Sequence, residues 1–127
     1  MNRNDFIKEY TAIIQRTLLL CSIARREGLL ALEETLDKEK INSRDILEYG
    51  IRFVIDGTDK LIIDKILSNI IEQEKDELKK ILKIIQKEAV SSIQEGLNPR
   101  LLLPLLNSYT DIPLTSEELD NYLEKIY

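Results

Sequence analysis

Histidine and tryptophan are missing from this chain of 127 residues, and Cys21 is its single cysteine. Without histidine no Ser–His–Asp or Cys–His arrangement can form, and a structural zinc site needs about four cysteine or histidine ligands. The sequence also has no glycine-rich phosphate loop, GxSxG elbow or nucleotide fingerprint. We therefore expect no catalytic residue, no cofactor and no metal, and a protein that is not an enzyme.

Long hydrophobic runs and a basic stripe are also missing. The longest apolar runs fall far short of the ~20 residues that a membrane helix requires, and the first five residues, MNRND, do not begin a signal peptide. The net charge is −5, with the two signs mixed along the chain. These features predict a cytoplasmic protein that does not insert into a membrane and does not bind nucleic acid.

Glycine and proline are scarce, with four and three residues respectively, and the stretches between them are mostly Leu, Ile, Glu and Lys at helical spacing. A chain of this length with 43% hydrophobic and 32% charged residues can bury a core of its own. We predict a single all-α domain, built on two long antiparallel helices as a hairpin or bundle, with short C-terminal helices.

The expected helices follow from apolar periodicity and capping residues. They cover residues 1–37 with a break near Gly28, 43–56, 59–95, 99–107 and 116–126. The pattern over 59–95 is long for a globular helix, so it indicates either a hairpin arm packed on the first helix or an antiparallel coiled coil. Asn98 and Pro99 are a typical N-cap and first helical residue, and Cys21 lies in an apolar stretch where a core position is expected.

Three segments carry a more specific signal. Residues 24–33 read ARREGLLALE, residues 50–59 read GIRFVIDGTD, and residues 88–100 read EAVSSIQEGLNPR. In order and spacing they resemble the cytoplasmic portion of MotA-type stator subunits of the bacterial flagellar motor, which belong to the MotA/TolQ/ExbB proton channel family. The four membrane helices of that family have no counterpart here, and two of them would fall within 59–95.

The resemblance implies a role in motility. In MotA-type stators the membrane helices bind the partner subunit and line the proton path, while cytoplasmic charges engage the rotor switch protein FliG. Carried over by position, the rotor-facing Arg and Glu correspond to Arg25 and Glu33, and Arg26 is the neighbour most easily confused with Arg25. On an unbroken helix, Arg25 and Glu33 would be about 12 Å and about 80° apart, so both could share one exposed side.

The function implied is that of a soluble, flagellar-motor-associated protein at the cytoplasmic face of the motor. It would bind FliG, or the stator subunits MotA and MotB, and modulate motor function as a monomer or homodimer. Alternatives are a cytoplasmic fragment or membrane-deleted form of a stator subunit, and a general helical adaptor. On physical grounds alone, the simpler explanation is that Arg25 and Glu33 are ordinary surface charges. Ion pairs between such charges contribute only ~0.2–1 kcal/mol to stability.

Overall fold

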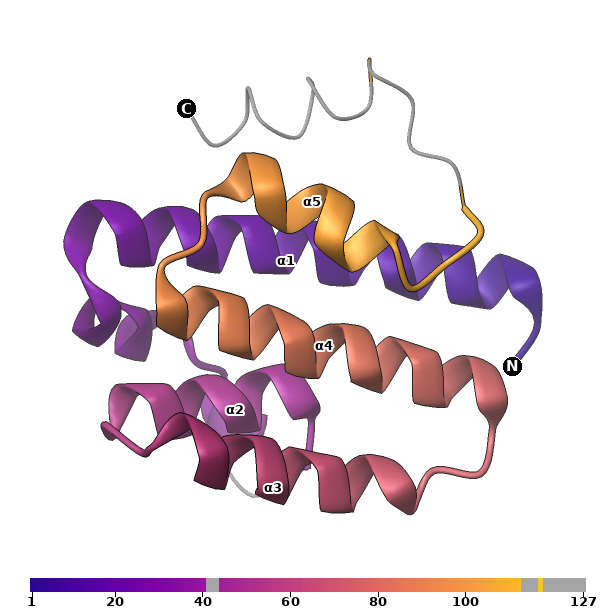
Figure 1. Ribbon diagram of the computed structural model, residues 1–127, viewed down its shortest axis with the longest axis horizontal. Coiled ribbons are helices and arrows are strands. Elements are labelled where there is room, and N and C mark those ends of the chain that lie inside the picture. The colour runs from indigo at the N-terminus through magenta and orange to yellow at the C-terminus, as the bar shows by residue number, and fades with distance from the viewer. Residues whose placement is uncertain (41–43, 113–116, 118–127) are drawn as a thin grey trace.

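The computed structural model describes residues 1–40, 44–112 and 117. The elements of this part of the chain are all helical, as predicted (Figure 1). They are α1 (Arg3–Glu27), η1 (Leu29–Thr35), η2 (Lys38–Lys40), α2 (Ile46–Ile55), α3 (Lys60–Glu72), α4 (Glu77–Glu95) and α5 (Pro99–Asn107), where η denotes a 3₁₀-helix. The helix expected over 116–126 lies outside the described residues, apart from Glu117.

The two longest helices, α1 and α4, lie side by side and run in the same direction (Figure 1). At one end the Met1 ammonium donates a hydrogen bond to the carboxylate of Asp76, the N-cap of α4. At the other end Arg25 Nη1 donates to the Gly96 carbonyl at 2.8 Å. The expectation of two long antiparallel helices is therefore wrong for this pair.

A second correction concerns residues 59–95, which form two antiparallel helices, α3 and α4, instead of one. The chain turns back at residues 73–76, where Glu74 Oε2 accepts hydrogen bonds from the backbone N–H groups of Lys75 and Asp76. Asp76 then caps α4 by accepting from Lys79 N at 3.0 Å. These side-chain acceptors replace the helical hydrogen bonds that are lost at the turn.

The helix expected over 1–37 ends earlier, at Glu27. Gly28 has φ +90°, a conformation that L side chains rarely adopt, and the chain leaves it as the 3₁₀-helix η1. The helix expected over 43–56 begins at Ile46, because Asp45 caps it by accepting from Glu48 N. Asn98 caps α5 in the same way, and Pro99 is its first residue.

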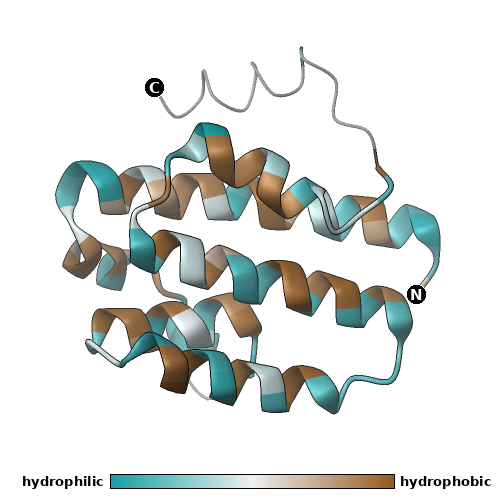
Figure 2. Ribbon diagram, viewed as in Figure 1, coloured by the Kyte–Doolittle hydropathy of each residue, from teal (hydrophilic) through white to brown (hydrophobic). Residues whose placement is uncertain are grey.

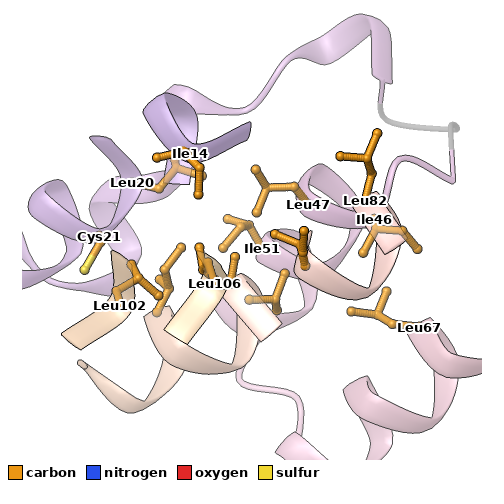
Figure 3. Close-up of a cluster of buried hydrophobic side chains, with 14 of the residues drawn as sticks. Ile14, Leu20, Cys21, Ile46, Leu47, Ile51, Leu67, Leu82, Leu102 and Leu106 are labelled. Carbon is orange, nitrogen blue, oxygen red and sulfur yellow. The ribbon is translucent and has the colours of Figure 1, made fainter. Parts of the chain in front are cut away.

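A continuous hydrophobic core lies between the five α-helices of the described part. Figure 3 shows side chains from all five elements meeting there, among them Ile14, Ile51, Leu67, Leu82 and Leu102. In Figure 2, hydrophobic segments recur along each helix between hydrophilic ones, as expected for helices that each bury one face. None of the described helices has the length and apolar content needed to cross a membrane.

α2 and α4 approach closely at Gly50. A Cβ atom at this position would lie 2.6 Å from Val90 Cγ2, 2.9 Å from Val90 Cγ1 and 3.1 Å from Leu67 Cδ1. Because real Cβ atoms essentially never approach within 3.0 Å of another heavy atom, only glycine fits without a shift of its neighbours. This contact fixes segment 50–59 against segment 88–100.

Candidate functional site

The end of the helical bundle on the left in Figure 1 brings together segments 24–33, 50–59 and 88–100. The end of α1 and the beginning of η1 come from 24–33, the end of α2 from 50–59, and the end of α4 from 88–100. Arg25 joins the first segment to the third through the Gly96 carbonyl. Gln94 Nε2 joins the third to the second by donating to the Thr58 carbonyl at 3.1 Å.

Arg25 is exposed, yet its guanidinium has a partner within the fold. Gly96 ends α4 with φ +72°, and its carbonyl accepts the hydrogen bond from Arg25 Nη1. The carbonyl groups at a helix C-terminus carry partial negative charge, which favours a cation there. Arg25 therefore has a structural role of its own, because it holds the ends of α1 and α4 together.

Arg26 and Glu33 are also exposed, and their side chains make weaker contacts within the described part of the fold than Arg25 does. Arg26 Nε donates to the Ser22 carbonyl at 3.4 Å, within its own helix. The Glu33 carboxylate makes no hydrogen bond or ion pair with any described residue. The separation expected for Arg25 and Glu33 on an unbroken helix does not apply, because α1 ends between them at Glu27.

A surface cleft of 520 Å³ lies between η1, η2 and α2 at this end. It contains both apolar and charged side chains, and its lining residues are Leu30, Ala31, Glu33, Glu34, Leu36, Lys38 and Arg52. Leu30 is 73% exposed. No ion pair forms among the four charged residues of the cleft.

The sequence interpretation missed Leu30 and Arg52 as candidate site residues. Three of the four residues after Gly28 are leucines, and a 3₁₀-helix of seven residues cannot bury all of them against one neighbour. Leu32 is fully buried and Leu30 faces outward. The run of leucines beside a helix break was the available signal, whereas the half-buried position of Arg52 depends on how η1 packs against α2.

The described part of the chain contains no group of three or more Asp, Glu or Cys side chains that could hold a metal ion. Cys21 is buried, and burial raises the pKa of its thiol, which disfavours the nucleophilic thiolate. The exposed charges and the cleft offer polar and apolar contacts to another molecule.

The chain matches no protein-family model, no curated protein and no solved structure in the three comparisons with known proteins.

Proposed function

We propose that this chain is a stator-like protein of the flagellar motor that binds the rotor switch protein FliG, or the stator subunits MotA and MotB, and modulates motor function. The observation that supports this best is the meeting of the stator-like segments 24–33, 50–59 and 88–100 at one end of the bundle. Segments far apart in the chain form a single surface there. One partner can therefore contact all three.

The exposed charges at this end suit a transient contact. Arg26 and Glu33 are accessible and are not held by ion pairs within the described residues. Charge complementarity at such positions sets the rate and orientation of encounter more than it sets affinity. A substitution of Arg25 is less informative about binding, because it also removes the hydrogen bond to the Gly96 carbonyl within the fold.

Titration calorimetry of the purified chain tests the proposal, with FliG in one series and detergent-solubilised MotA–MotB in another. The informative variant is the charge reversal Arg26→Glu with Glu33→Arg, which leaves the net charge unchanged. We expect the wild-type chain to bind one of the two partners and the reversal to weaken this binding about tenfold or more, with helical content and Tm unchanged.

The matched control is Lys8→Glu with Glu9→Lys. Both residues are exposed in the first half of α1, toward the opposite end of the bundle. We expect this reversal to leave the affinity unchanged. The absence of binding to either partner would contradict the proposed function. Equal weakening by both reversals would contradict the assignment of the contact to this end.

A further inference from the structure

The cleft between η1 and α2 has an apolar part that the fold leaves uncovered. Leu30 stands at its edge with 73% of its surface exposed, and Ala31 and the half-buried Leu36 lie beside it. Removing an exposed leucine side chain from water is favourable. The cleft therefore offers an anchoring position to a large apolar side chain from another molecule.

The charged part of the cleft contains side chains of both signs that do not pair with one another. Glu33 and Glu34 come from η1, Lys38 from η2 and Arg52 from α2. Arg52 is half-buried, and its guanidinium has no hydrogen-bond or ion-pair partner among the described residues. An arginine that has lost part of its hydration, with its planar donors unused, favours a carboxylate as ligand.

The shape of the cleft favours a protein segment over a small molecule. Pockets for small ligands enclose roughly 70–90% of the ligand surface, whereas here the main apolar side chain lies mostly in solvent. Arginine is enriched at protein interfaces relative to the rest of the protein surface. A cleft of similar volume near the start of α1 is lined by Met1, Asp5, Lys8, Glu9, Ala12 and Lys79, and it has no leucine of this exposure.

We propose that the cleft formed by η1 and α2 binds a segment of the partner protein that presents a large apolar side chain next to a carboxylate. The apolar side chain covers Leu30 and Leu36, and the carboxylate pairs with Arg52. A basic side chain of the same segment faces Glu33 and Glu34. This inference rests on the proposed function and identifies the part of the surface that the partner contacts.

The test measures the affinity for FliG, and for MotA–MotB, of the variants Leu30→Ala and Arg52→Gln. The matched control for the first is Leu61→Ala, because Leu61 is 76% exposed in the first turn of α3 and outside the cleft. The control for the second is Lys8→Gln, a cation in the cleft near the start of α1. We expect each cleft variant to raise Kd about tenfold or more and each control to change it less than twofold.

The outcomes separate this inference from the proposed function. Binding that none of the cleft variants weakens, or that Leu61→Ala weakens as much as Leu30→Ala, would overturn the cleft assignment and leave the proposed function standing. No binding by the wild-type chain would overturn both. Sedimentation of the wild-type chain as a dimer that Leu30→Ala dissociates would also overturn the inference, because a second copy would then occupy the cleft.

Discussion

Arg16 and the buried Glu48 form an ion pair of 2.9 Å that connects α1 to α2. Arg16 Nη2 also donates to the Thr35 carbonyl at 2.6 Å, and Glu48 Oε2 accepts from Asp37 N at 3.2 Å. The two side chains thus hold both the end of η1 and the residues after it. They position the η1 wall of the cleft against α2.

Replacement of Arg16 by Met should lower the free energy of unfolding by about 1–3 kcal/mol, because it leaves the buried Glu48 carboxylate without its cation. The double variant with Glu48→Gln should lose less, since no unpaired charge remains. Urea denaturation measures both. The control is Arg3→Met, which removes the exposed pair with Asp111 and should change stability by at most about 0.5 kcal/mol. A loss equal to that of the control would show that the Arg16–Glu48 pair is not structural.

Gly50→Ala should destabilise the protein by about 1–2 kcal/mol, although alanine is the better helix former by roughly 1 kcal/mol. The reason is the contact of the new Cβ with Val90, a β-branched side chain that has little freedom to move aside. Denaturant unfolding measures this effect. In the Val90→Ala background the same substitution should be neutral or stabilising, and the double-mutant cycle should give a coupling of about 1 kcal/mol or more. Additive effects would show that the close approach has no energetic consequence.

Part of this architecture could be predicted from the sequence, and the rest depends on tertiary contacts. The all-helical fold follows from apolar periodicity and the scarcity of glycine and proline, and the beginning of α5 follows from Asn98 and Pro99. The turn between α3 and α4 has neither glycine nor proline, so its sequence reads as a continuous helix. What separates the two helices is capping by Asp76 and the packing of both on α2.

The candidate site, too, could be predicted only in part from the sequence. The ARREGLLALE segment drew attention to Arg25, Arg26 and Glu33, which are exposed on the surface. That Arg25 binds the Gly96 carbonyl could not be predicted, because it depends on α1 and α4 running in parallel. The cleft could not be predicted either, because Arg52 and Leu30 are 22 positions apart and meet only through the packing of η1 on α2.

Stability should fall in acid, partly through the carboxylates of the turn between α3 and α4. Hydrogen bonds from the Asp76 backbone and from Lys83 lower the pKa of Glu74, and the Met1 ammonium lowers the pKa of Asp76. At the same pH the folded state therefore binds fewer protons than the unfolded state. The stabilisation that results is fully present above the unfolded pKa of about 4, and it is lost as the pH falls through the folded pKa. Wild type and Glu74→Gln should differ in Tm at pH 7 and converge once the pH has fallen below the folded pKa of Glu74. A difference that persists in acid would show that the charge of Glu74 is not its cause.

The Cys21 thiol should react slowly with a disulfide reagent such as DTNB in the native protein. It is buried, its Sγ lies 3.4 Å from the Leu97 carbonyl, and its raised pKa leaves little thiolate at pH 7. We expect modification to follow opening of the structure, so that stabilised and destabilised variants react at different rates. The destabilised variant Gly50→Ala should therefore react faster than wild type. Rapid reaction of the wild-type thiol at a rate independent of stability would contradict its burial.

The salt dependence of the affinity should distinguish the charged contacts of the proposed interface from the apolar contact. At about 0.5 M salt the Debye length falls to roughly half of its ~10 Å value at 0.1 M, so contacts made by the exposed Arg26 and Glu33 should be screened. The affinity of the wild-type chain for its partner should therefore fall as salt rises.

Leu30→Ala should lower affinity by a nearly constant factor at every salt concentration, because the contact that it removes is apolar. Arg52→Gln should reduce the salt dependence itself, because it removes one of the charges that salt screens. Calorimetric titrations at a series of NaCl concentrations measure both slopes, and a Leu30→Ala effect that disappears in high salt would contradict an apolar anchor at that position.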